Sequence, residues 1–113
     1  MKEAIGEHYI LELFDCPFKT LDDESLVAGA VRQACRAGGL TLLGLQSHKF
    51  EPQGVTTLGL LSESHISIHT WPEHGYAAAD VFTCSNTCSP GRACDSLADL
   101  LQAGRSDVSV VAR

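Results

Sequence analysis

Apolar and polar residues alternate along several short segments of the chain, and this alternation predicts a β-sheet. In residues 8–15 Tyr9, Leu11 and Leu13 fall on one face of an extended segment, which is typical of a strand. Further strands are predicted over residues 40–50, 55–61, 65–70, 76–84 and 107–112. Turn residues at 51–54 and a break at 71–75 separate two pairs of these strands.

A first helix is predicted from about residue 22 to residue 37. Thr20 or Asp22 is a candidate N-cap, and Gly38-Gly39 is expected to end the helix. Its apolar residues recur at helical spacing and predict a buried stripe of Val27, Val31, Ala34 and Cys35.

A second helix is predicted from Ser89, with Pro90 at its first position and Gly104 at its end. Its inner face is expected to carry Cys94, Leu97 and Leu101. Strand, helix, several strands, helix, strand is an order typical of the α+β class. It indicates an α/β sandwich with two helices packed on one face of a largely antiparallel sheet. The other sheet face is also rich in apolar residues, so a second copy of the chain is a candidate cover.

The most polar strand lies within residues 62–73. Ile66 and Ile68 fall on one face there, and His65, Ser67 and His69 fall on the other, which makes this strand a candidate reactive surface. His65 and His69 would form a metal-binding pair on a helix, but the alternation and the following Pro72 argue against a helix.

Composition narrows the class of protein. The 113 residues, 44% of them hydrophobic, lack repeats and linkers, so residues 1–113 are expected to form a single domain. The net charge of −6 argues against a nucleic-acid partner. The N-terminus lacks the apolar core of a signal peptide, and no apolar run approaches the roughly 20 residues that a membrane span needs. We therefore expect a cytoplasmic protein without a membrane partner.

The five cysteines are an odd number, which argues against a secreted disulfide scaffold. Cys84, Cys88 and Cys94 could join a histidine around zinc, but their spacings do not match the usual Cys-x2-Cys pairs. We therefore predict no metal site.

Three motifs in order carry a family resemblance. They are Glu63-Ser64-His65, then His-Thr-Trp-Pro-Glu at 69–73, then Phe82-Thr83-Cys84. Together they resemble the signature of the prokaryotic S-adenosylmethionine decarboxylase proenzymes, a pyruvoyl-dependent family. The resemblance implies self-cleavage between Glu63 and Ser64, with Ser64 becoming the pyruvoyl cofactor. It also implies a homodimer of processed α/β-sandwich protomers, with sites near the subunit interface.

The resemblance further implies roles for individual residues. Ser64 would be the nucleophile of an N-to-O acyl shift, His69 would drive processing, and Cys84 would return a proton to the substrate. Phe50 and Glu73 are expected to bind the substrate, although Phe50 could instead belong to the core, and Glu73 could instead orient Cys84.

Two departures from the family pattern bear on these roles. Gly54-Val55-Thr56-Thr57 stands where the family has Gly-Val-Ser-Gly, so Thr56 is expected to support processing in place of serine. Ser47-His48-Lys49-Phe50 stands where the family has Phe-His-x-Phe, and Ser47 is expected to leave a polar pocket.

The resemblance implies a small-molecule amino-acid substrate, S-adenosylmethionine, whose decarboxylation releases carbon dioxide and feeds polyamine synthesis. Arginine or ornithine decarboxylation on the same scaffold is the alternative reaction. A non-catalytic binding homologue is the alternative from another class.

Overall fold

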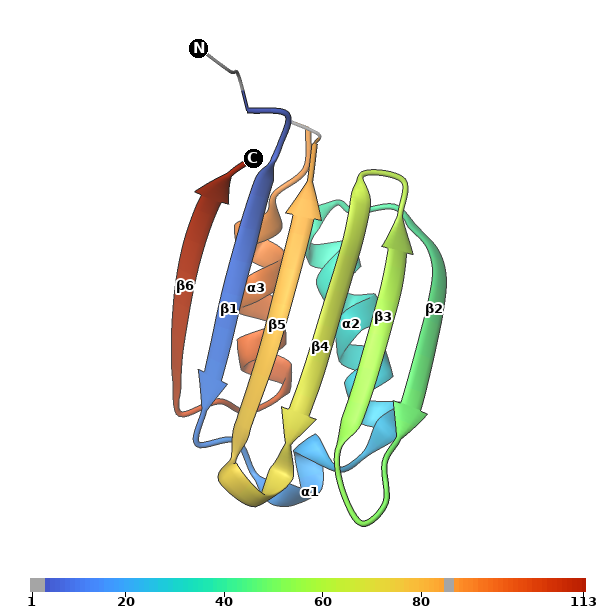
Figure 1. The fold of residues 1–113 in the computed structure, drawn as a ribbon, viewed down its shortest axis with the longest axis vertical. Helices are drawn as coiled ribbons and strands as arrows, with labels where there is room; N and C mark the ends of the chain where they lie inside the picture. Colours follow the sequence, from blue (N-terminus) through green and yellow to red (C-terminus); the bar gives the residue numbers. More distant parts are fainter. Residues whose placement is uncertain (1–3, 85–86) are drawn as a thin grey trace.

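The computed structural model describes residues 4–84 and 87–113, and they form one antiparallel sheet with helices on one face (Figure 1). The strands follow the order β2-β3-β4-β5-β1-β6, and every neighbouring pair is antiparallel. This confirms the predicted α+β sandwich. The elements are β1 (Glu7–Phe14), α1 (Phe18–Leu21), α2 (Glu24–Gly38), β2 (Leu42–Lys49), β3 (Val55–Leu61), β4 (Ser64–Trp71), the 3-10 helix η1 (Pro72–His74), β5 (Tyr76–Thr83), α3 (Pro90–Leu100) and β6 (Arg105–Ala112).

The core lies between the sheet and the two long helices, α2 and α3. Both predicted apolar stripes are buried there: Val27, Val31, Ala34 and Cys35 of α2, and Cys94, Leu97 and Leu101 of α3 and its C-cap. In β4 Ile66 and Ile68 are fully buried against this layer. His65, Ser67 and His69 point to the opposite face, as the alternation predicts.

The predicted N-caps of the first long helix were wrong. Asp23 is the N-cap of α2, and its carboxylate accepts a hydrogen bond from the Leu26 amide. Thr20 instead belongs to α1, a four-residue helix that the sequence reading missed because one turn is too short to show a period. Asp22 follows α1 as its C-cap and bonds the β2–β3 turn.

Some strand ends also differ from the prediction. β2 begins at Leu42 rather than residue 40, and β6 begins at Arg105 rather than residue 107. β6 is longer because its pairing with β1 continues to the Phe14–Arg105 pair, where the Arg105 guanidinium lies 4.0 Å from the Phe14 ring centroid. Register with the neighbouring strand therefore set an end that composition did not mark.

The second face of the sheet has no helix over it among the described residues (Figure 1). Large apolar side chains are exposed on this open face: Ile10, Leu58, Leu60, Trp71 and Val111. In the described ranges no helix is long and apolar enough to cross a membrane. The reactive strand β4 lies near the middle of this open face.

Candidate active site

Ser64 is the first residue of β4 and has an unusual backbone conformation. Its φ angle is 152°, a region that residues with a Cβ rarely adopt. Conformations of this kind cost on the order of 1–3 kcal/mol and persist where the surroundings enforce them. The predicted cleavage point is therefore a strained peptide junction.

The carbonyl oxygen of Glu63, which precedes Ser64, accepts two hydrogen bonds from Cys84. The Cys84 amide nitrogen lies 3.2 Å from this oxygen and the Cys84 thiol sulfur 3.4 Å from it. Two donors on one carbonyl favour the negative charge that develops there when a nucleophile attacks its carbon. The antiparallel Ser64–Thr83 pair places Cys84 at this point.

The Glu63 side chain is held on the other side of the junction. Its carboxylate accepts hydrogen bonds from the Thr41 amide and hydroxyl, at 3.0 and 3.1 Å. Burial alone would raise the pKa of Glu63, but these hydrogen bonds outweigh it and the pKa is lowered. The junction is therefore fixed from both the Thr41 and the Cys84 sides.

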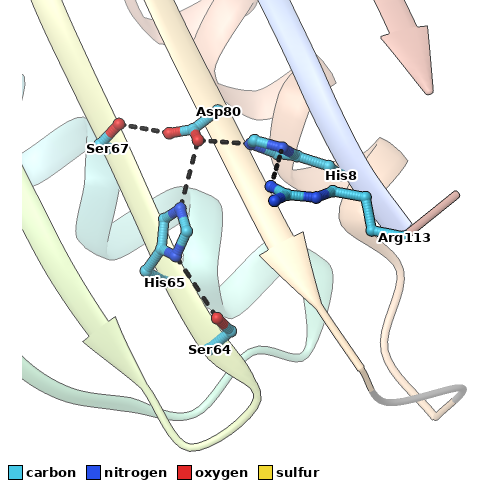
Figure 2. A network of polar contacts seen from close by, with 6 residues as sticks. All are labelled: His8, Ser64, His65, Ser67, Asp80 and Arg113. Carbon is cyan, nitrogen blue, oxygen red and sulfur yellow. Dashed lines mark hydrogen bonds and ion pairs between the residues drawn. The ribbon is translucent and has the colours of Figure 1, made fainter. Parts of the chain in front are cut away.

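A chain of polar contacts leads away from Ser64 across the open face (Figure 2). Ser64 Oγ lies 3.4 Å from His65 Nδ1, and His65 Nε2 lies 3.2 Å from Asp80 Oδ2. His8 Nε2 contacts the same carboxylate oxygen at 2.5 Å. Ser67 donates to Asp80 Oδ1, and the Arg113 guanidinium lies 3.3 Å from His8 Nδ1.

Hydrogen bonds keep Asp80 ionised within this group. Burial would raise the pKa of the Asp80 carboxyl, but hydrogen bonds from Ser67, His8 and His65 lower it by more. The carboxylate therefore acts only as an acceptor at neutral pH.

His69 lies in the other half of β4, away from Ser64. Five residues along a strand correspond to about 16 Å, so His69 cannot touch Ser64 of the same chain. His69 Nδ1 instead lies 2.9 Å from Thr56 Oγ1 on β3. The hydroxyl of Thr56 therefore lies next to the His69 ring.

A groove of about 350 Å³ surrounds His69 at this end of the sheet. Phe50, Trp71 and Glu73 line it, together with Thr56. Phe50 is 45% exposed, which contradicts a place in the core and leaves its ring open to a ligand.

Glu73 and Cys84 lie at opposite ends of β5. Glu73 lies in the helix η1 just before β5, and Cys84 directly follows β5. The eight residues of β5 lie between the two sites, a separation of about 23 Å. Glu73 and Cys84 of the same chain are therefore too far apart for a direct contact.

The turn beside the groove is anchored to the helical layer. The Asp22 carboxylate accepts a hydrogen bond from the Gly54 amide at 2.9 Å and forms an ion pair with Lys49 at 3.0 Å. Gly54 has a φ of 108°, which favours glycine, and an added Cβ would lie 3.2 Å from the Thr70 carbonyl. This anchor holds Phe50 and Thr56 beside His69.

The two departures from the family pattern face one another. Ser47 and Thr57 are directly paired across β2 and β3, and their hydroxyl oxygens lie 2.7 Å apart. Thr57 is fully buried on the helix side of the sheet. The Ser47 hydroxyl therefore contacts a buried threonine side chain at the position where the family pattern has glycine.

The described cysteines form no disulfide and no cluster with metal-binding geometry. Cys16, Cys35 and Cys94 are buried, and burial raises the pKa of each thiol to about 11. Cys84 is exposed. Among the described residues, three side chains of metal-binding type lie close together. They are His8, His65 and Asp80, and their ligand atoms lie within 4.8 Å of one another.

The sequence analysis did not single out His8, Asp80 or Arg113, which the structure brings together beside His65. The available signal was that His8 and Asp80 each lie at an outward position of a predicted strand. The contact could not be read from the sequence, because the two residues are 72 positions apart.

Comparison with known proteins decides the family. Residues 7–113 match the sequence profile described as S-adenosylmethionine decarboxylase. The chain belongs to this family. It is 57% identical to the S-adenosylmethionine decarboxylase proenzyme of Synechococcus sp. (strain WH7803), over 88% of this chain and 77% of that protein. It is 44% identical to the proenzyme of Methanococcus aeolicus (strain ATCC BAA-1280 / DSM 17508 / OCM 812 / Nankai-3), over 96% of this chain and 93% of that protein.

A solved structure has the same fold. The crystal structure of the adenosylmethionine decarboxylase from Aquifex aeolicus VF5 superposes with a TM-score of 0.90 and 34% identity. The superposition covers 99% of this chain and 92% of that one. The bacterial and archaeal relatives share the name proenzyme, which agrees with the resemblance of the Glu63-Ser64 motif.

Proposed function

We propose that this chain is a self-processing proenzyme that cleaves itself between Glu63 and Ser64 and then decarboxylates S-adenosylmethionine. The observation that carries the proposal is the Glu63 carbonyl, which accepts both donors of Cys84 directly beside the strained Ser64. Cleavage would leave residues 1–63 and 64–113 as two chains of one folded unit.

The first step of processing is an acyl shift at this junction. Ser64 Oγ attacks the Glu63 carbonyl carbon, and the Cys84 amide and thiol stabilise the oxyanion. The Glu63–Ser64 amide then becomes an ester, with the Ser64 amine free. Release of the unfavourable φ angle of Ser64 supports this direction.

The second step needs a base for the Ser64 α-proton, after which the Glu63 carboxylate leaves and water releases ammonia. We assign this base to His69 of a second copy. In β4, Ser64 is the first residue and His69 lies near the other end of the strand. When the open faces of two copies pack with their strands antiparallel, the Ser64 end of one copy meets the His69 end of the other, and a twofold axis forms two equal sites.

This assembly also completes the substrate site. The Ser64–Cys84 end of one copy would face the groove with Phe50, Trp71 and Glu73 of the other. Exposed apolar side chains of both sheets would be buried between them, which favours association. A homodimer therefore accounts for the separation of the two halves of the site within one chain.

A pyruvoyl group at residue 64 supplies an electron sink for the pair of electrons that the departing carboxyl leaves behind. The residues present suit such a group, because Ser64 is its precursor and Cys84 donates a hydrogen bond to the neighbouring Glu63 carbonyl oxygen. Cys84 would hold the proton that returns to the substrate α-carbon.

The groove residues favour S-adenosylmethionine as the substrate. Phe50 and Trp71 offer aromatic faces for the adenine and for the sulfonium cation, and Glu73 offers a carboxylate. The family profile and the two relatives described above are named for S-adenosylmethionine decarboxylase, which disfavours arginine, ornithine and a non-catalytic binding role.

The deciding test is an intact mass spectrum of the purified protein and of Ser64→Ala. We expect two chains from the wild type, with residues 64–113 lighter by one ammonia, and one uncut chain from Ser64→Ala. Carbon dioxide release from carboxyl-labelled S-adenosylmethionine should follow cleavage, with arginine and ornithine as matched controls. An uncut wild type, or full activity in Ser64→Ala, would exclude the proposal.

A further inference from the structure

We propose that His65 is the general base that takes the hydroxyl proton of Ser64 in the acyl shift, and that Asp80 and His8 position it. This inference rests on the proposed self-processing and assigns its first proton transfer. It starts from the contact of His65 with the reacting oxygen, since His65 Nδ1 lies 3.4 Å from Ser64 Oγ. Figure 2 shows the contact at the start of β4.

The tautomer of each ring follows from the ends of the network. An arginine side chain only donates, so His8 Nδ1 must accept from Arg113 and the His8 proton lies on Nε2. That proton points to Asp80 Oδ2. The ionised carboxylate only accepts, so His65 Nε2 must also carry a proton toward Oδ2.

The remaining nitrogen of His65 is therefore a free acceptor. With the proton on Nε2, the Nδ1 lone pair points at Ser64 Oγ, so the serine hydroxyl donates to it. Asp80 also stabilises the imidazolium that forms when Nδ1 takes the proton, as a buried carboxylate does in a serine-histidine-aspartate triad. Ser67, bonded to the other carboxylate oxygen, holds Asp80 in place.

A metal ion is the competing occupant of the same side chains, and the tautomers argue against it. Coordination by His8 Nε2 would move the ring proton to Nδ1, which faces the Arg113 donor. Two donors would then oppose one another next to a fixed positive charge. The observed contacts favour a proton relay over a cation site.

The proposed step balances without a further reactant. The Ser64 Oγ–H bond breaks and its proton moves to His65 Nδ1, while Oγ forms a bond to the Glu63 carbonyl carbon. The carbon–nitrogen bond then breaks, and the proton on Nδ1 moves to the Ser64 nitrogen. The product is an isomer of the starting chain, and His65 returns to its initial state.

The test follows cleavage of newly synthesised chain over time by intact mass spectrometry. His65→Gln keeps a polar side chain of similar length but cannot act as a base. We expect cleavage to slow by about 100-fold or more, the usual size of a general-base contribution. His74→Gln, at an exposed position of η1, is the matched control and should cleave at the wild-type rate.

Hydroxylamine separates the acyl shift from the later elimination, because it cuts an ester but not an amide. Uncut His65→Gln should resist hydroxylamine, since its junction is still an amide. His69→Ala should accumulate the ester and be cut at residue 63. Wild-type cleavage rates in His65→Gln, or hydroxylamine cutting of that variant, would overturn the role of His65.

The same experiment distinguishes this inference from the proposed function. A wild-type chain that never cleaves would refute self-processing itself, whereas normal wild-type cleavage with an unaffected His65→Gln refutes only the base assignment. Added imidazole should restore part of the cleavage rate in His65→Ala, and absence of rescue in a folded His65→Ala protein would count against the base.

The pH dependence of the cleavage rate distinguishes the base, His65, from the positioning residue His8. The charged or titratable groups that face His65 are Asp80 from β5, His8 from β1 and Arg113 after β6, while β3 presents Leu60. Cleavage of the wild type should slow as acid protonates the base, and His65→Gln should lose that dependence. His8→Gln should keep it, which assigns the dependence to His65. Persistence of the acid limb in His65→Gln would contradict the assignment.

Discussion

Thr56 and His69 are joined by a hydrogen bond of 2.9 Å between the hydroxyl on β3 and the ring nitrogen on β4. The bond crosses the directly paired residues of the two strands, so it fixes the His69 ring by strand register. The contact is made by the hydroxyl, which threonine shares with the serine of the family pattern.

We predict that Thr56→Val slows self-cleavage by about fivefold to tenfold, the effect of losing one hydrogen bond of about 1 kcal/mol. Valine keeps the shape of threonine, so the fold should not change. Thr56→Ser, which keeps the hydroxyl, should cleave at close to the wild-type rate. Mass spectrometry over time measures the cleavage rate. Equal cleavage rates for Thr56→Val and Thr56→Ser would contradict the assignment.

We predict that two inactive variants restore one site when mixed as a dimer. Ser64→Ala lacks the nucleophile and His69→Ala lacks the proposed base, and neither should complete cleavage alone. In a mixed dimer the intact Ser64 of the His69→Ala chain faces the intact His69 of the Ser64→Ala chain. We therefore expect cleavage of the His69→Ala chain only, which a mass tag on one chain would reveal.

If the mixed dimer forms and the His69→Ala chain stays uncut, the assignment of the base to His69 of a second copy is wrong. Sedimentation of the same samples provides the control, since complementation requires that the mixed dimer forms.

We predict that Ser47→Phe alone destabilises the fold by about 1–3 kcal/mol, because the added ring enters space that Thr57 fills. Combining it with Thr57→Gly restores the family arrangement and should recover much of that loss. Urea unfolding of the two single variants and the double variant gives the coupling free energy. Additive effects would show that the two positions do not share the space.

We predict that the Asp80 carboxylate stabilises the fold and that this stabilisation is lost in acid. Its pKa in the folded chain is lower than the ordinary value, so the stabilisation is complete above about pH 4, the unfolded pKa. The stabilisation is lost as pH falls through the lower folded pKa. The free energy of unfolding of the wild type should exceed that of Asp80→Asn at pH 7, and the difference should shrink below pH 4.

The exposed carboxylate of Asp95 on α3 provides the control for this titration. Asp95→Asn should leave the pH dependence of unfolding close to that of the wild type. A difference between wild type and Asp80→Asn that stays constant down to pH 2 would contradict the predicted linkage.

We predict that iodoacetamide modifies Cys84 before the three buried cysteines. Cys84 is exposed, whereas Cys16, Cys35 and Cys94 are buried and have pKa values of about 11, so little thiolate forms at pH 8. Peptide mapping of uncut Ser64→Ala protein measures the order of labelling. The same protein in denaturant is the control, and equal rates for buried and exposed thiols in the native state would contradict the prediction.

The amino-acid sequence by itself determined the local features of this protein. Alternation placed Ile66 and Ile68 inward and His65 and His69 outward, because side chains on a strand point to opposite faces in turn. The helical stripes were equally readable, since burial of one face imposes a period on the sequence. The motifs around Ser64 indicated the family, which the comparisons confirmed.

Only the tertiary structure decided which of these residues meet. Antiparallel register places Cys84 at the Glu63 carbonyl and leaves His69 about 16 Å from Ser64, although both belong to one strand. It also brings His8 to Asp80 across 72 residues and pairs Ser47 with Thr57. Sequence periodicity fixes the face on which a side chain lies, whereas contact depends on strand order and register, which arise from packing of the whole sheet.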